Sequence, residues 1–388
     1  MSAGFERPLF TARKPHVLAF APGRTELAGN HVDHQHGRVM SAAVSLSIRA
    51  EAAENGMDVV RVDSDGFDPV AVDVHDGAPR ECEYGTAASL VRGMVVCFED
   101  AGIPVRGFDV EAASTLPAGG GLSSSAAFEM LVGQIMNVLF ADGSVDAMTL
   151  AQWGKRTECE WFGKPCGLQD QTIVSHGGIA LMDFSDPAHP VLTPVDFDFR
   201  RAGYAVILVD THCDHSLHTH EFAQIPADMQ RVARLFGKDV LGQVDPATFY
   251  RRLPEVRAAA GDRAALRALH FFHEDDLVMR RVRALRAGDM ASFLKWTNAS
   301  GVSSAQYLQN VSSGGGEQPA AVALALADIV LDGRGAFRIH GGGFGGTIQA
   351  YVPLDLVPEF CERMDGWLGE GSCLDLPIGA PGASASWR

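Results

Sequence analysis

Long apolar runs are absent from this sequence of 388 residues, and no pair of cysteines has the C-x-x-C spacing. The best apolar window, residues 320–327, stops at Asp328, whereas a membrane-spanning helix needs about 18 such residues. Near the N-terminus, Arg13 and Lys14 precede any apolar segment of a secretory signal. The seven cysteines are scattered, which is typical of a reducing compartment. We expect a soluble protein of the cytoplasm without a membrane partner.

Basic side chains are few: 32 Lys and Arg residues stand against 48 Asp and Glu, and the formal net charge is −16. This excess of negative charge would weaken any surface that follows the phosphates of a nucleic acid. We therefore expect no nucleic-acid partner, although one small anion can still be bound locally. We also expect the chain to be a monomer.

The sequence lacks the motifs of several large enzyme classes. It contains no G-x-x-x-x-G-K-[ST] segment, which excludes an ordinary P-loop NTPase, and no H-R-D or D-F-G segment of a protein kinase. Ser123 is followed by Ser124 and Ser125 instead of the glycine of a G-x-S-x-G nucleophile elbow, so a serine hydrolase is disfavoured. We interpret these serines as ligands.

The sequence does contain a mixture of strand and helix patterns, in a chain whose length predicts two domains. The expected strands are 17–21, 44–52, 59–63, 107–112, 178–184, 204–209, 336–340 and 347–352, the early ones forming an antiparallel sheet. The expected helices are 87–98, one beginning after Gly121, 149–162, 224–236, 254–260, 263–272, 276–287, 290–299 and 356–368. We expect an α+β fold with domains 1–200 and 201–388, and a frayed tail at 379–388.

Glycines and serines are combined at the start of one predicted helix: Gly119, Gly120, Gly121, Leu122, Ser123, Ser124 and Ser125. Glycines let the backbone approach a ligand, the first helical turn offers unpaired N–H groups, and hydroxyls add donors or metal ligands. An isolated tract of this kind is equally typical of a loop with serine caps. Its length and the serine run favour a phosphate-binding loop.

A second tract, 341–346, holds five glycines and matches G-x-G-x-x-G. The residues after it alternate as a strand, whereas the dinucleotide-binding fingerprint opens a helix. We therefore interpret the tract as a hairpin between two strands. Five glycines exceed what a two-residue hairpin requires, so close approach of another segment or a ligand is the better explanation.

Polar residues are dense between 21 and 37, although a loop between strands needs only turn residues. Arg24 follows a Pro-Gly turn, and His31 and Asp33 can bracket the hydroxyls of a small polar ligand. Histidines recur here and at 212–220, which raises the alternative of a zinc site. Neither group has the H-E-x-x-H spacing, so zinc is disfavoured, and solvated or hydrogen-bonding histidines remain an alternative.

A third segment, 158–171, holds two informative acids: Glu158 ends a predicted helix, and Asp170 follows a Pro-Cys-Gly turn. The two can reach one pocket from different directions. Phosphoryl transfer needs this division, with one carboxylate for Mg²⁺ and another for the attacking hydroxyl. In a chain with 48 acids, either residue alone is more simply a surface acid.

Together and in this order, the segments resemble the GHMP small-molecule kinases, and most closely their galactokinase branch. Pro22-Gly23-Arg24 with Gly29, His31, Asp33 and Gly37 resembles the sugar signature of that branch. The stretch 117–126 resembles its ATP loop, 341–346 its closing motif, and Glu158 with 165–171 its metal and catalytic stretch. The resemblance covers about 22–352, nearly the whole chain.

The resemblance implies a two-domain GHMP kinase fold, with an N-terminal domain like ribosomal protein S5 domain 2, a ferredoxin-like C-terminal domain, and the site between them. It implies transfer of phosphate from ATP to the anomeric hydroxyl of a monosaccharide, with galactose as the first choice. By analogy, Asp170 is the base or orienter for that hydroxyl, and Arg24 holds Asp170 and stabilises charge on the transferred group. Ser125 and Glu158 would bind Mg²⁺, residues 119–125 would wrap the triphosphate, and His31, Asp33 and Gly167 would contact the sugar.

Three positions depart from the galactokinase pattern. Asn30 and His34 stand where that branch usually has glutamate and tyrosine, and Phe222 aligns with a sugar-contacting tyrosine. We count Asn30 and Phe222 among the sugar-binding residues, and the departures bear on the choice of sugar. Galacturonate, arabinose and N-acetylgalactosamine are the alternatives to galactose, and a non-catalytic sensor of sugar and ATP is the alternative to an enzyme. A metal-dependent hydrolase ranks third.

Overall fold

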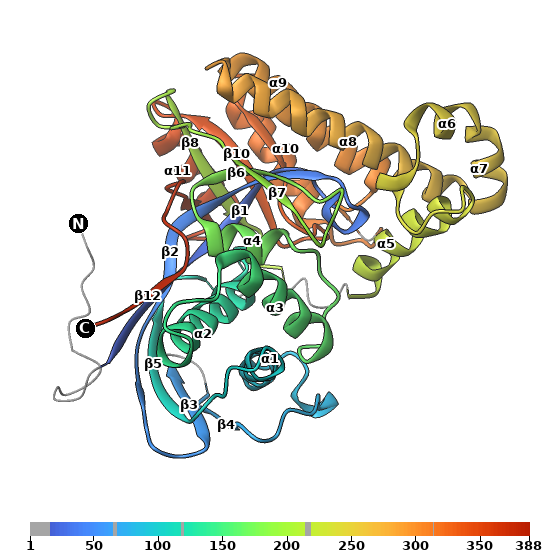
Figure 1. Ribbon diagram of the computed structural model, residues 1–388. Coiled ribbons are helices and arrows are strands. Elements are labelled where there is room, and N and C mark those ends of the chain that lie inside the picture. Colours follow the sequence, from blue (N-terminus) through green and yellow to red (C-terminus); the bar gives the residue numbers. More distant parts are fainter. Residues whose placement is uncertain (1–15, 65–67, 118–119, 214–218, 313) are drawn as a thin grey trace.

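Two β-sheets and the helices packed on them make up the residues that the computed structural model describes, which are 16–64, 68–117, 120–213, 219–312 and 314–388 (Figure 1). Strands and helices are grouped and do not alternate regularly along the chain. The predicted α+β class is therefore confirmed. Gly119, His215 and His218 lie outside the described residues.

Within the described ranges, the first sheet has eight strands. They are β1 (Val17–Ala28), β2 (Arg38–Glu54), β3 (Val59–Ser64), β4 (Val70–Asp73), β5 (Phe108–Ser114), β6 (Ile179–Asp183), β7 (Val191–Pro194) and β12 (Ser384–Trp387). The main order is β12-β1-β2-β5-β3-β4, and β6 joins β2 to β7.

Two predictions for this sheet were wrong. The sheet is not wholly antiparallel, because β3 pairs with β5 in parallel, with Arg61 opposite Asp109. Parallel neighbours need a long crossover, and here the chain passes through β4 and a helix before it returns. In addition, β1 continues to Ala28, so Arg24 is a strand residue and does not belong to a loop.

Helices α1 (Ala87–Asp100), α2 (Ser124–Phe140), α3 (Ala147–Glu160) and α4 (Gln169–His176) lie on one face of the first sheet (Figure 1). Thr86 caps α1, and Asp146 caps α3 by accepting from two backbone N–H groups. The predicted helices 87–98 and 149–162 are confirmed, whereas α4 was not predicted. It matters most for function, because it carries Asp170.

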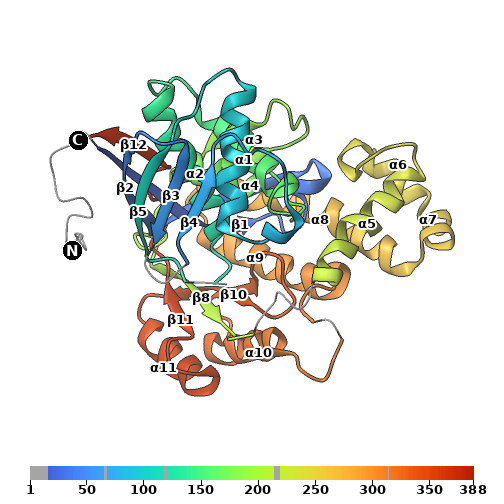
Figure 2. The ribbon, with the colours of Figure 1, turned by 90° about the horizontal axis from the view of Figure 1, so that it is seen from below.

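A helical region follows β8 (Tyr204–Asp210). It contains α5 (Thr219–Arg234), α6 (Pro246–Arg251), α7 (Leu253–Ala260), α8 (Asp262–Arg286) and α9 (Met290–Ser303). Figure 2 shows α6 and α7 at the outer end of this region, away from both sheets. The two predicted helices 263–272 and 276–287 are one continuous helix, α8.

The second sheet has the order β11-β8-β10-β9, with β9 (Ala336–Ile339), β10 (Thr347–Pro353) and β11 (Cys373–Asp375). Every pair in it is antiparallel. Helices α10 (Pro319–Leu331) and α11 (Val357–Leu368) pack on it through Ala327 and Phe360. The strand order 4-1-3-2 is that of a ferredoxin-like fold, as the resemblance implied. The hairpin interpretation of 341–346 is also confirmed, because this tract joins β9 to β10.

The two sheets share buried contacts. Leu27 of β1, Val282 of α8 and Tyr351 of β10 belong to one apolar cluster. The predicted frayed tail was wrong: β12 pairs with the start of β1, with Trp387 opposite Val17. Residues near both ends of the described chain therefore meet in one sheet. None of the helices in the described ranges is long and apolar enough to span a membrane.

Candidate active site

Arg24 lies at the centre of the site, where β1 carries it into the interior. Arg24 is 8% exposed. The guanidinium donates from Nε and Nη2 to the two carboxylate oxygens of Asp170, at 2.5 and 2.6 Å, and from Nη1 to the carbonyl of Gly121 at 2.6 Å. The backbone N–H of Arg24 donates to the carbonyl of Leu122 at 3.1 Å. Arg24 thus joins the polar segment 21–37 to the serine loop and to the segment 158–171.

Asp170 lies in the first turn of α4, where the helix dipole favours a negative charge. Its Oδ2 also accepts a hydrogen bond from the hydroxyl of Ser123. Burial alone would raise the pKa of Asp170, but the charge of Arg24 and the hydrogen bonds from Arg24 and Ser123 hold that pKa below its ordinary value. Asp170 is therefore ionised at neutral pH, firmly oriented and only weakly basic.

The serine loop has the backbone of an anion-binding turn. Ser123 adopts a left-handed conformation with φ of 56°, and α2 begins directly after it at Ser124. Gly121 has φ of 70°, and a Cβ there would lie 2.9 Å from the Thr347 hydroxyl, so glycine allows the close approach to β10. Unpaired N–H groups at the start of α2 and the serine hydroxyls point to phosphate binding. Of the residues 119–125 that were predicted to bind the triphosphate, the structure describes Gly120 to Ser125, and these lie together in this loop.

Glu158 faces the serine loop from the end of α3 and is 2% exposed. Its Oε1 accepts from the hydroxyl of Ser125 at 3.0 Å and from Nζ of Lys164 at 3.2 Å. Its Oε2 accepts from the amide of Gln171 at 2.6 Å. The same amide donates to Glu129 at 3.1 Å, and burial followed by the charge of Glu158 raises the pKa of Glu129 well above its ordinary value. Ser125 and Glu158 therefore form the pair of oxygens that the prediction assigned to a metal.

Asp33 approaches Gly167 so closely that a Cβ on the glycine would lie 1.6 Å from Oδ2 of the aspartate. Burial, followed by the charge of Asp170, raises the pKa of Asp33 to about 6. The carboxylates of Asp33 and Asp170 are therefore close enough for their charges to interact. Asp33, Gly167 and Asp170, which the sequence predicted as sugar contacts, lie together.

Asn30 and His31 hold the glycine tract between β9 and β10. The Asn30 amide, which is fully buried, donates to the carbonyl of Gly341 at 2.6 Å, and its oxygen accepts from the Asn310 amide at 2.9 Å. Nε2 of His31 lies 3.0 Å from the carbonyl of Gly342. Burial, followed by the charge of His34, lowers the pKa of His31 to about 3. The side chains of Asn30 and His31 thus have hydrogen-bond partners within the protein.

Phe222 of α5 packs on the same tract. A Cβ on Gly342 would lie 2.3 Å from its ring, and the ring meets Phe344 edge to face at 5.2 Å between centroids. The five glycines of 341–346 are thus explained in part by close approach of α5. Phe222 therefore contacts the same glycine tract as Asn30 and His31, although it lies about 190 positions away from them in the sequence.

Sequence reasoning missed three polar side chains of the site: Lys164, Gln171 and His340. His340 lies 2.9 Å from the Thr25 hydroxyl and 3.1 Å from the Thr347 hydroxyl, and burial lowers its pKa well below the ordinary value. Gln171 directly follows Asp170, and Lys164 directly precedes the Pro-Cys-Gly turn. Lys164 and Gln171 lie within the segment 158–171, and His340 directly precedes the glycine tract 341–346; this placement was the signal that could have found them.

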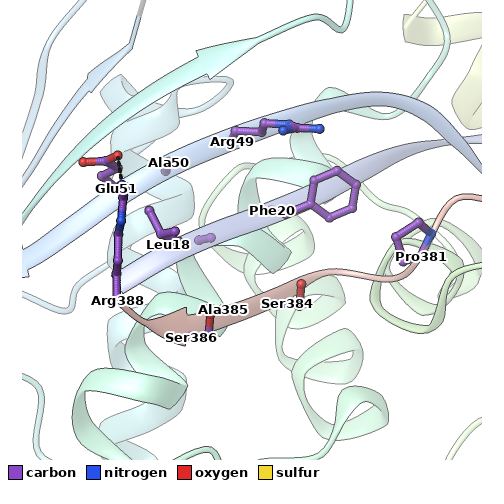
Figure 3. A pocket seen from close by; sticks show the side chains of 11 residues that line it. Leu18, Phe20, Arg49, Ala50, Glu51, Pro381, Ser384, Ala385, Ser386 and Arg388 are labelled. Atoms are coloured by element: carbon purple, nitrogen blue, oxygen red, sulfur yellow. Dashed lines mark ion pairs between the residues drawn. The ribbon is translucent and has the colours of Figure 1, made fainter. Parts of the chain in front are cut away.

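Surface hollows are also present among the described residues. A trough of about 810 Å³ runs over β1, β2 and β12, and Leu18, Phe20, Arg49 and Arg388 line it (Figure 3). None of its lining residues was predicted for the site. A hollow of about 260 Å³ adjoins the serine loop at Pro117 and Gly120 and reaches Ser372. In the described part of the chain, no group of three or more His, Cys, Asp or Glu side chains is arranged to hold a metal.

The fold and this site define a GHMP kinase. Residues 89–178 match the family described as GHMP kinases N terminal domain, and residues 7–54 match the galactokinase galactose-binding signature. A galactokinase of Streptomyces coelicolor is 32% identical over 352 residues, which cover 89% of this chain and 87% of that protein. A galactokinase of Enterococcus faecalis is 29% identical, with coverage of 89% and 88%.

The crystal structure of Lactococcus lactis galactokinase complexed with galactose superposes with a TM-score of 0.82 at 23% identity, covering 95% of each chain. A mevalonate kinase structure gives a TM-score of 0.65 at 14% identity, covering 93% of this chain and 99% of that one. These two likenesses show the fold. The chain belongs to the galactokinase family, and the resemblance seen in the sequence is confirmed.

Proposed function

We propose that this protein transfers the γ-phosphoryl group of ATP to the anomeric hydroxyl of a monosaccharide, D-galactose first, giving the sugar 1-phosphate and ADP. The observation that carries the proposal is the contact of Asp170 with both Arg24 and Ser123. It joins the residue assigned to the sugar hydroxyl to the loop assigned to the triphosphate. Membership of the galactokinase family supports the same reaction.

In this reaction the anomeric oxygen forms a bond to γ-phosphorus while the bond from γ-phosphorus to the bridging oxygen of ADP breaks. The hydroxyl proton is accepted or oriented by Asp170. Because its pKa is held low, Asp170 is a weak base, and its main role is to orient the hydroxyl and not to remove the proton before phosphoryl transfer begins. This suits a loose phosphoryl-transfer transition state, which needs little deprotonation of the nucleophile. Arg24 is close enough to Asp170 to fix its direction and to balance charge on the transferred group.

The residues present fit Mg²⁺. Hydroxyl and carboxylate oxygens are the ligands that it prefers, and Ser125 Oγ and Glu158 Oε1 lie 3.0 Å apart. Ser125 and Glu158 would hold it, and when bound it neutralises charge on the phosphates. The same proposal includes a cytoplasmic monomer, a division of the chain near residue 200, and Asn30, His31, Asp33, Gly167 and Phe222 as sugar-binding residues.

The test is release of ADP from ATP with galactose, galacturonate, arabinose or N-acetylgalactosamine as acceptor, at equal protein concentration. Turnover with galactose supports the proposal. Turnover with another sugar alone would replace the substrate and keep the chemistry. If none of the four sugars gives ADP release while calorimetry still detects binding of sugar and ATP, the proposed enzymatic activity is contradicted and a sensor is favoured. Size-exclusion chromatography with light scattering tests the monomer.

A further inference from the structure

We propose that Lys164 is a built-in counter-ion of Glu158: its ammonium pairs with the carboxylate oxygen assigned to the metal and competes with the metal for the charge of that carboxylate. This inference rests on the proposed function, because the metal role of Glu158 is part of it. It concerns a residue for which the sequence predicted no role.

The geometry places two unlike groups on one oxygen. Glu158 Oε1 receives the Ser125 hydroxyl at 3.0 Å and the Lys164 ammonium at 3.2 Å. The other oxygen, Oε2, is taken by the Gln171 amide at 2.6 Å. A metal ligated by Ser125 and Glu158 through this oxygen would share it with the Lys164 ammonium.

This ion pair differs from an ordinary surface pair. The Glu158 side chain is 3% exposed, whereas that of Lys164 is 62% exposed. A buried carboxylate needs a compensating charge, since burial of an unpaired charge is costly. The neighbouring Glu129 supplies none, because it is an acid, and its Oε1 has no hydrogen-bond partner in the described structure. Lys164 reaches the buried anion from solvent and can withdraw without leaving a cavity.

The backbone keeps Lys164 near the site after such an exchange. Its N–H donates to the carbonyl of Glu158 at 3.0 Å, so only the flexible side chain has to move. A Mg²⁺ ligand oxygen lies about 2.0–2.1 Å from the ion, which leaves no room for an ammonium on the same lone pair. On the other lone pair, the ammonium would still lie close to the charge of the metal, and like charges repel. Bound metal and the present ion pair therefore weaken each other.

The consequence is competition between a tethered cation and the metal. The ligand-free enzyme carries a neutralised site, and its affinity for the metal is lowered by the free energy of the Lys164 pair. Removing the ammonium should strengthen metal binding while it leaves binding of metal-free nucleotide nearly unchanged. A lysine that served only to bind phosphate would do the reverse, because its loss would weaken nucleotide binding with and without metal.

The experiment is a Mn²⁺ titration of nucleotide-free protein, followed by electron paramagnetic resonance, and calorimetry of ADP in EDTA and in excess Mg²⁺. We expect Lys164→Met to bind Mn²⁺ about two- to fivefold more tightly than wild type, the range for a partly exposed ion pair. The ratio of the ADP dissociation constants in EDTA and in Mg²⁺ should rise by the same factor. Lys164→Arg should resemble wild type, because it keeps the charge.

Lys155→Met is the matched control, since it removes a lysine of α3 whose charge acts on Asp33. It should leave Mn²⁺ affinity unchanged. Equal Mn²⁺ affinity in wild type and Lys164→Met, or a weaker one in the variant, would overturn the inference. Lys164→Gln repeats the test should the methionine variant fold poorly. Since these measurements need no sugar, an inactive wild type would count against the proposed function alone.

Discussion

Arg24 and Asp170 face each other through two parallel hydrogen bonds, although 146 positions separate them in the sequence. Such a bidentate pair fixes the plane of the carboxylate as well as its position. The Asp170 carboxylate is thereby oriented by a strand of the first sheet as well as by its own short helix. The pair makes each partner's orientation sensitive to small changes in the other.

Asp170→Asn is expected to lower turnover by at least about 10²-fold, the usual effect of losing a positioned proton-transfer group. The affinity for ADP should stay close to that of wild type, because asparagine keeps an oxygen that can accept from the Ser123 hydroxyl of the serine loop. The measurements are kcat from ADP release and the ADP dissociation constant from calorimetry. Turnover within a few fold of wild type would remove Asp170 from the catalytic role.

Asp33 is expected to make stability and sugar binding depend on pH near 6. Its pKa is raised in the folded protein to about 6, from the ordinary 3.8, so its ionised form is disfavoured by folding. Its full contribution to stability is present below about pH 4 and is lost as the pH rises through 6. Asp33→Asn should therefore melt a few degrees above wild type at pH 7.5, and the difference should vanish at pH 4.

Thermal melts at several pH values test this, with the exposed Asp239→Asn as a control that should show no such trend. The KM for the sugar in wild type should also increase below pH 6, as Asp33 gains a proton. A variant that is less stable than wild type at pH 7.5 would contradict the raised pKa.

Gly167→Ala is expected to act through Asp33. The new methyl group would lie 1.6 Å from the present position of Oδ2, so the carboxylate has to move. We expect the KM for the sugar to rise by at least about tenfold, since small displacements of binding groups are costly, while ADP affinity is kept. In an Asp33→Ala background the same change should add little, because the obstructing oxygen is gone. Additive effects of the two changes would refute the contact.

Arg281→Met is expected to destabilise the fold by about 3–5 kcal/mol, because it removes the cation of the ion pair that the buried Glu274 makes. Burial raises the pKa of Glu274, but the charge of Arg281 outweighs this and lowers it to about 2. Urea unfolding measures the loss. The exposed Arg283→Met on the same helix should cost little, and Glu274→Gln combined with Arg281→Met should restore much of the stability. A loss equal to that of Arg283→Met would contradict the prediction.

Much of the fold follows from local patterns, and in the exceptions the tertiary structure overrides a local signal. Helix α8 was predicted as two helices, 263–272 and 276–287, on either side of the polar residues His273, Glu274 and Asp275. In the structure, Glu274 is paired with Arg281 and accepts from the N–H of Gly29 at 3.1 Å, so the helix continues through it. Strand β1 was predicted to end at residue 21 because Pro22 and Gly23 are typical of a turn, whereas β1 runs through them with a shift of its register against β2.

The site was predictable where its residues lie in one segment, as in the serine loop. Pairings between segments were not, because nothing in the sequence states which distant group satisfies a polar side chain. The Arg24–Asp170 contact was expected only from the family resemblance, and the Lys164–Glu158 pair was not expected at all. Helix α4 lacks a capping side chain at its start, which removed the signal that marks most helix beginnings.

Strand β12 sets a condition on how the protein can be made. The edge of β1 pairs with residues 384–387, so it stays open on the ribosome until more than 360 further residues have been synthesised. An open edge offers unpaired backbone groups to other chains, and early domains of a growing polypeptide are exposed in this way. Nascent chains, and variants shortened before residue 384, should therefore rely on chaperones more than the finished protein does.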